Sequence, residues 1–152
     1  MHTETDPNTP APHWAYTLHV PHDARAVGIA RSTLHAVLLR NGLPQLLDTA
    51  VLLASELLTN AYLHSAGPAS LRLRWAERTL RLGVWDTDPH PPVPTGPLET
   101  EQPHGRGLLL VRVCADTWGW FPLGDERSGL RGKYVWCELT QPTDPDRWDI
   151  AA

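Results

Sequence analysis

One change of hydrophobic period limits what this chain can fold into. From Asp23 to Ser65 the apolar residues recur at intervals of three and four, a spacing typical of amphipathic helices, and Asn41-Gly42 divides this part into two helices. From Ser70 to Asp86 apolar and polar residues alternate instead, which is typical of a hairpin with one face in water. The sequence therefore predicts helices packed against a sheet.

The remaining segments complete an α+β order. The sequence predicts strands at 14–20, 70–75, 80–86, 117–123 and 132–140, and helices at 23–41, 44–64 and 106–116. Residues 87–105 contain six prolines and no periodicity, a pattern that often marks a functional lid. We expect a two-layer α/β sandwich, with a mixed sheet covered on one face by about three helices. This domain spans 13–140, between a disordered N-terminal tail at 1–12 and a C-terminal tail at 141–152.

Composition excludes several classes of protein. The 152 residues suffice for one globular domain, and they contain no run of about 18 uninterrupted apolar residues of the kind that a membrane span needs. The formal net charge is −4 and the arginines are scattered, which argues against a nucleic-acid surface. The polar N-terminus lacks the features of a secretory signal, so we expect a cytoplasmic protein with Cys114 and Cys137 reduced.

Three polar side chains interrupt the second helix at intervals of four, at Glu56, Asn60 and His64. A step of four advances about 400° around a helix, so the three lie nearly on one line beside the apolar face. A carboxylate and an amide oxygen one turn apart suit a hydrated Mg²⁺, and the carboxylate can also accept a proton from a nucleophile. The alternative is a solvated face near a helix end, where the helix dipole favours His64.

The stretch HGRGLLLV, from His104 to Val111, leaves the proline-rich segment and opens a helix. Gly105 and Gly107 expose backbone N–H groups at the positive end of the helix dipole, which suits phosphate. The spacing fits neither a P-loop nor a dinucleotide fingerprint. A flexible joint between the segment and the helix is the alternative.

Asp86 closes the second strand of the hairpin. A single carboxylate at the bottom of an apolar pocket accepts a hydrogen bond from an exocyclic amine, and so distinguishes adenine from guanine. Taken alone, an aspartate in this position is more often a turn former.

The order of these features is more specific than any one of them. It runs Glu-x-x-x-Asn-Ala-x-x-x-His on a helix, Val-Trp-Asp at a strand end, Gly-Arg-Gly-Leu opening a helix, and Gly-Lys-x-Val-Trp on a last strand. From about Trp14 to Thr140 the chain resembles the GHKL ATPase superfamily, which implies a histidine-kinase-like ATPase domain with the Bergerat-type ATP-binding fold. Within it, the chain is most similar to the RsbW-like anti-sigma-factor serine/threonine kinases of the actinobacterial single-domain type.

The resemblance implies a role for each matching residue. Asn60 would coordinate the Mg²⁺ that bridges the ATP phosphates, and Glu56 would be the general base that activates a serine hydroxyl or a water. Asp86 would bind the adenine amino group. The phosphates would be bound at the start of the next helix, by Gly105, Arg106, Gly107 and Leu108.

Two positions depart from the superfamily pattern. The adenine motif usually reads Asp-x-Gly-x-Gly, whereas Asp86 is followed here by Thr-Asp-Pro-His, so the pocket floor and the lid hinge are expected to differ. The last strand usually offers a threonine hydroxyl, whereas this chain has Lys133. We expect that lysine to be a solvated strand residue, with approach to a nucleotide phosphate as the alternative. His64 matches a position that is commonly histidine in the subgroup, and its role stays open.

The resemblance implies an ATP- and Mg²⁺-dependent protein serine/threonine kinase. Such a kinase would phosphorylate a STAS-type anti-anti-sigma partner, sequester a sigma factor and so regulate transcription, and it is compatible with a homodimer. The alternative, motivated by the altered adenine motif, is a non-catalytic regulatory module that binds proteins and has weak or lost ATP binding. No direct nucleic-acid or membrane partner is expected.

Overall fold

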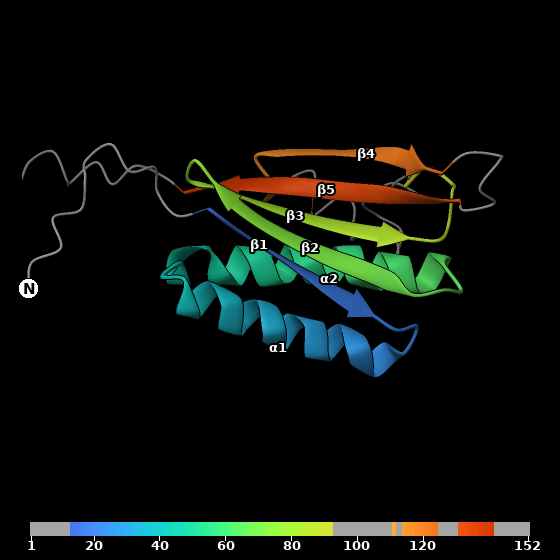
Figure 1. Cartoon of the computed structure of the whole chain (residues 1–152), viewed down its shortest axis with the longest axis horizontal. Helices are drawn as coiled ribbons and strands as arrows, with labels where there is room; N and C mark the ends of the chain where they lie inside the picture. Colours follow the sequence, from blue (N-terminus) through green and yellow to red (C-terminus); the bar gives the residue numbers. More distant parts are fainter. Residues whose placement is uncertain (1–12, 93–110, 112–113, 125–130, 142–152) are drawn as a thin grey trace, which may run out of the picture.

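The computed structural model of the chain describes residues 13–92, 111, 114–124 and 131–141. Its elements are β1 (Trp14–Val20), α1 (Ala24–Arg40), the 3₁₀ turn η1 (Pro44–Leu46), α2 (Leu47–His64), β2 (Ala69–Ala76), β3 (Thr79–Asp86), β4 (Thr117–Leu123) and β5 (Gly132–Thr140). The strands form one five-stranded sheet, and α1 and α2 lie against one of its faces (Figure 1). The predicted two-layer α+β sandwich is confirmed.

Every strand pair in the described sheet is antiparallel, so the expectation of a mixed sheet is wrong. The two helices return the chain to the end at which β1 finishes, where Val20 pairs with Ala69, so β2 runs back along β1. Across the whole sheet the strand order is β1-β2-β3-β5-β4, so β5 lies between β3 and β4. Because β3 and β4 point the same way, the insertion of β5 between them makes both of its pairings antiparallel.

Two α-helices pack on the sheet in the described residues, rather than about three. The third predicted helix, at 106–116, falls mostly outside the described ranges. Within them, Val111 is fully buried and its carbonyl accepts a hydrogen bond from the Ala115 N–H at 3.0 Å. The tails at 1–12 and 142–152 and residues 93–105 also lie outside the described part, so the predictions made for them are not tested.

The starts of the two helices follow from a capping side chain and a proline. The Asp23 side chain caps α1 by accepting a hydrogen bond from the Arg25 N–H at 2.9 Å. Pro44, expected to open the second helix, begins η1 instead, and α2 starts at Leu47.

A leucine-rich core lies between the helices and the sheet. Its most buried leucines, at most 2% exposed, are Leu34, Leu38, Leu53, Leu58, Leu71, Leu80 and Leu82. Each buried leucine contributes about 1.5–3 kcal/mol to folding. By length and mean hydropathy alone, Pro44–His64 could cross a membrane. Its apolar face is instead part of this core, which makes it the central helix of the domain.

Candidate functional site

α2 carries Glu56 and Asn60 on the flank of its buried face. Six residues of that face pack into the core, namely Ala50, Leu53, Ala54, Leu57, Leu58 and Ala61. Glu56 and Asn60 are half-buried beside them, and in the part of the chain that the structure describes neither side chain forms a hydrogen bond. Burial raises the pKa of the Glu56 carboxyl, which makes the carboxylate a better proton acceptor. The Glu56 carboxylate and the Asn60 amide oxygen are therefore both available to a ligand.

A side-chain hydrogen bond joins the end of α2 to the end of β3. The hydroxyl oxygens of Ser65 and Thr87 lie 2.6 Å apart, and Ser65 Oγ accepts a further hydrogen bond from the Gly67 N–H at 3.2 Å. A Cβ on Gly67 would lie 2.7 Å from Thr87 Oγ1, so this close approach favours glycine. Thr87 follows Asp86 directly, and Asn60 precedes Ser65 by about one and a half helical turns. The fold therefore brings the C-terminal end of α2 beside the end of β3, at the corner where Asp86 lies.

Asp86 is buried and forms an ion pair with Lys133. The Lys133 ammonium donates to Asp86 Oδ1 at 3.1 Å, to the Asp88 carbonyl at 3.2 Å and to Asp88 Oδ2 at 3.2 Å. Burial raises the pKa of Asp86, and the Lys133 ammonium opposes that rise. Burial also acts to raise the pKa of Asp88, but hydrogen bonds from His90 and Lys133 outweigh it, so the pKa of Asp88 is lowered.

The expectation that Lys133 is a solvated strand residue is wrong, because the residue is only 1% exposed. The other inward positions of β5 are apolar, at Val135, Cys137 and Leu139, and Lys133 shares their phase in the alternation. A charge in that phase needs a partner inside the domain. The alternation therefore predicts that Lys133 is buried with a partner, and the register of β3 with β5 makes Asp86 that partner.

β5 begins against the backbone of Asp86. A Cβ on Gly132 would lie 2.2 Å from the Asp86 carbonyl oxygen, so the contact requires glycine. The Gly132-Lys133 dipeptide thus has two functions at this corner: the glycine permits the close approach, and the lysine neutralises the carboxylate.

Two consecutive turns follow Asp86, where the superfamily motif has glycines. Asp86 Oδ1 accepts a hydrogen bond from the Asp88 N–H at 2.8 Å, and Asp88 Oδ1 accepts one from the His90 N–H at 3.2 Å. In such turns a side-chain oxygen replaces a backbone acceptor. Apart from glycines, only Glu77 and Arg78 among the described residues have a positive φ. Asp88 and His90 therefore form the turn without the backbone conformation that favours glycine.

The other predicted site residues are less constrained. His64 is exposed in the last turn of α2. The predicted phosphate-binding residues, Gly105, Arg106, Gly107 and Leu108, lie outside the described ranges, so their role stays a prediction. Sequence reasoning missed Ser65, Thr87 and Asp88. Of these, only Asp88 had a signal, because an Asp-x-Asp spacing at a strand end is typical of a side-chain turn.

The side-chain oxygens at this corner fit a magnesium nucleotide. All the hydrogen bonds that described residues make to the Asp86 carboxylate end on Oδ1. The Asp86 side chain is only 2% exposed, and its Oδ2 accepts no hydrogen bond from a described residue, so Oδ2 would be the oxygen that accepts one from a base. The described residues hold no group of three acidic, histidine or cysteine side chains suited to a metal. A Mg²⁺ beside Asn60 would therefore take its other ligands from phosphates and water.

Comparison with known proteins agrees with this geometry. The sequence matches the histidine kinase-like ATPase domain family over residues 20–126, a range that contains Glu56, Asn60 and Asp86 but not Lys133. No curated protein matches the chain. The family match covers well over half of the sequence, and a sheet with helices on one face is consistent with the Bergerat fold. The chain therefore belongs to the histidine kinase-like ATPase domain family, within the GHKL superfamily.

Proposed function

We propose that this chain is an ATP-dependent protein serine/threonine kinase of the anti-sigma-factor type. It binds MgATP at the corner between α2 and β3 and phosphorylates a STAS-type anti-anti-sigma protein. While that protein is unavailable, it holds a sigma factor and so regulates transcription. It acts in the cytoplasm, on protein partners rather than on nucleic acid or membrane.

One observation carries the proposal. In a chain of this ATPase family, Glu56 and Asn60 present two unpartnered oxygen groups one helical turn apart. The hydrogen bond between Ser65 and Thr87 holds their helix beside Asp86, whose Oδ2 accepts no hydrogen bond from a described residue. A general base, a Mg²⁺ ligand and a base-reading carboxylate thus share one corner.

Phosphoryl transfer depends mainly on positioning and on charge stabilisation, so these few groups suffice. Mg²⁺, when bound, neutralises charge on the phosphates, and the Asn60 amide oxygen would hold it. Glu56 accepts the proton of the attacking serine hydroxyl. Because burial raises its pKa, Glu56 is a stronger base than an ordinary glutamate.

Nucleotide binding is tested by calorimetric titration with MgATP. The wild type is expected to bind with micromolar to millimolar affinity, and N60A to give no measurable heat because the metal ligand is gone. T59A is the matched control, since Thr59 is an exposed neighbour on the same helix and should bind as the wild type does. Absence of heat with the wild type would remove the kinase function.

Transfer is tested with E56Q, using γ-labelled ATP and a STAS-type protein from the same genome. E56Q should bind MgATP normally but transfer no label. Because burial raises the pKa of Glu56 above 4.5, transfer by the wild type should decline with falling pH already above that value, as the base becomes protonated. An E56Q variant that transfers label at the wild-type rate would show that Glu56 is not the base.

The second candidate is a regulatory module that binds proteins without catalysis. The ion pair between Lys133 and Asp86 favours it, because the carboxylate that would read adenine is already neutralised on one oxygen. With this function, the wild type would bind a sigma factor equally well with and without MgATP, and titration with the nucleotide would give no heat.

A further inference from the structure

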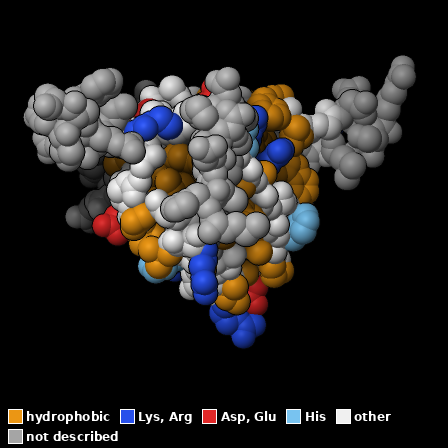
Figure 2. All heavy atoms as spheres, turned by 60° about the vertical axis from the view of Figure 1, so that its left-hand side comes forward, with side chains coloured by type: hydrophobic (Ala, Val, Ile, Leu, Met, Phe, Trp, Pro, Cys, Tyr) orange, Lys and Arg blue, Asp and Glu red, His pale blue; other side chains and the backbone are white. Residues whose placement is uncertain are grey.

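The sheet face opposite the helices carries a hollow lined by arginines and aromatic rings. α1 and α2 cover the other face (Figure 1). The hollow has a volume of about 340 Å³ and is lined by Arg72, Arg74, Arg81, Phe121, Leu123 and Tyr134, here called the arginine groove. On the face shown in Figure 2, Lys and Arg side chains lie beside hydrophobic ones rather than in a separate block.

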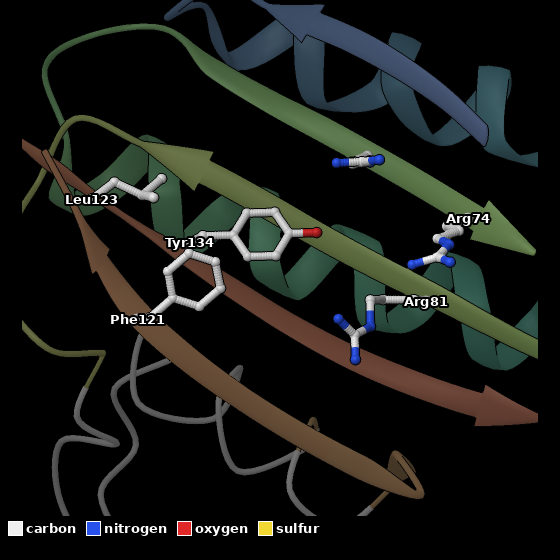
Figure 3. Close-up of a pocket in the computed structure, with 6 residues that line it drawn as sticks. Arg74, Arg81, Phe121, Leu123 and Tyr134 are labelled. Atoms are coloured by element: carbon white, nitrogen blue, oxygen red, sulfur yellow. The ribbon is translucent and has the colours of Figure 1, made fainter.

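The arginine groove is apolar at one end and cationic at the other. Figure 3 shows Phe121 and Leu123 on one side of the Tyr134 ring and the Arg74 and Arg81 guanidinium groups on the side to which the Tyr134 hydroxyl points. A second hollow of about 200 Å³ shares Arg74 and Arg81 and continues to Thr79 near the β2–β3 turn. The two hollows are therefore neighbours that share these two arginines.

Two glycines let the aromatic rings lie flat on the sheet. A Cβ on Gly83 would lie 1.8 Å from the Tyr134 hydroxyl oxygen, and a Cβ on Gly119 would lie 2.6 Å from the Trp136 ring. Phe121 packs on Tyr134 with ring centroids 5.2 Å apart. The floor of the groove is thus a packed aromatic surface that the sequence builds with glycine at the two positions beneath the rings.

The arginines carry positive charge that the groove does not neutralise. Arg81 is fixed by Glu138, with Nη2 and Oε1 2.6 Å apart, and lies 4.3 Å from the centroid of the Trp136 ring. Arg72 and Arg74 are exposed, and across the described ranges neither forms an ion pair. Among the described residues, the hollow itself is lined by three guanidinium groups and no carboxylate, while Glu138, which pairs with Arg81, and Glu77 line the adjoining hollow, and the whole chain has a net charge of −4.

The exposure of the lining side chains favours a polypeptide over a small ligand. Phe121 is 44% exposed and Arg72 and Arg74 remain exposed, whereas a small-molecule site buries most of its ligand. From β2 to β4 there are three interstrand steps, roughly 14 Å, which an extended segment crosses with about four residues. Arginine binds carboxylates through two parallel hydrogen bonds. A nucleic acid would need more positive charge than this groove offers.

We infer that the arginine groove binds an acidic segment of a partner protein, with carboxylates on Arg72 and Arg74 and an apolar side chain on Phe121 and Leu123. The groove lies on the sheet face opposite α2, so the inference does not depend on whether a nucleotide binds at the corner between α2 and β3. It assigns a docking surface to the face that the helices leave open.

The test is a calorimetric titration of the full chain with the synthetic peptide acetyl-Leu-Ser-Gly-Ser-Asp-Gly-Asp-amide. The wild type should bind it, and R72A/R74A should weaken binding at least about tenfold, because two paired carboxylates lose their partners. A peptide with asparagine in place of both aspartates should lose as much affinity. R31A, which removes an exposed arginine on α1, should bind as the wild type does.

Several outcomes would overturn the inference. The wild type would fail to bind the peptide at millimolar concentration, or R31A would lose as much affinity for the peptide as R72A/R74A does. Displacement of the bound peptide by acetate at the concentration at which the free peptide displaces it would also contradict the inference. Tighter binding of a ten-nucleotide oligouridylate than of the peptide would assign the groove to single-stranded nucleic acid instead. Because Arg72 and Arg74 are exposed, R72A/R74A should keep the wild-type thermal midpoint, and a lowered midpoint would contradict their assignment to binding alone.

Discussion

Lys133 and Asp86 neutralise one another where little water reaches them, at 1% and 2% exposure. K133M keeps an unbranched side chain but leaves the carboxylate buried without a cation. We expect it to lower the free energy of unfolding by about 3–5 kcal/mol, as measured by urea denaturation. The double variant K133M/D86N carries no buried charge at this pair and should recover much of the loss. A K133M protein as stable as the wild type would contradict the buried pair.

The same two residues mark how far the site could be predicted. Asp86 was found from its position at a strand end and from the resemblance, both of which are properties of a short stretch. The burial of Lys133 follows from the alternation in β5, but its partner depends on which strand lies next to β5. The hydrogen bond between Ser65 and Thr87 had no signal, since each residue alone reads as an ordinary helix end or turn.

At the level of elements, α1 offers a direct measure of the core. Leu34 is fully buried in the middle of the helix, whereas Leu39 is 48% exposed near its end. L34A should lower the free energy of unfolding by about 2–5 kcal/mol, because it removes buried methyl groups and leaves a cavity. L39A makes the same chemical change at the surface and should cost less than about 1 kcal/mol. Equal losses in the two variants would mean that α1 packs by another face.

Local patterns predicted the elements better than their arrangement. The limits predicted for β1, at 14–20, are those observed, and the two helices differ from prediction only near their ends. The period of three and four or of two is set by neighbours in sequence, so it can be read locally. The expectation of a mixed sheet is wrong because strand direction depends on the insertion of β5 between β3 and β4, which no local pattern encodes.

At the scale of the whole molecule, Cys137 reports opening of the domain. Both cysteines are free thiols; Cys114 is half-buried, and burial raises the pKa of the Cys137 thiol to about 12. In C114A, labelling of Cys137 by a thiol reagent should be at least about 1,000-fold slower in the native protein than in denaturant, because it requires an opening that costs several kcal/mol. The companion variant C137A, which keeps Cys114, should be labelled faster in the native state than native C114A is. Native C114A that reacts at the denatured rate would contradict a closed core.

β5 is the last of the described strands in sequence, yet it lies inside the sheet. Its register with β3 joins Thr79 to Thr140 and Asp86 to Lys133. During synthesis on the ribosome, β3 emerges well before its partner and keeps an unpaired edge until β5 has been made. Only then does Asp86 meet its counter-charge. The corner at which we propose that ATP binds is thus among the last parts of the domain to be completed, and a nascent chain that has not reached β5 lacks the finished Asp86–Lys133 pair.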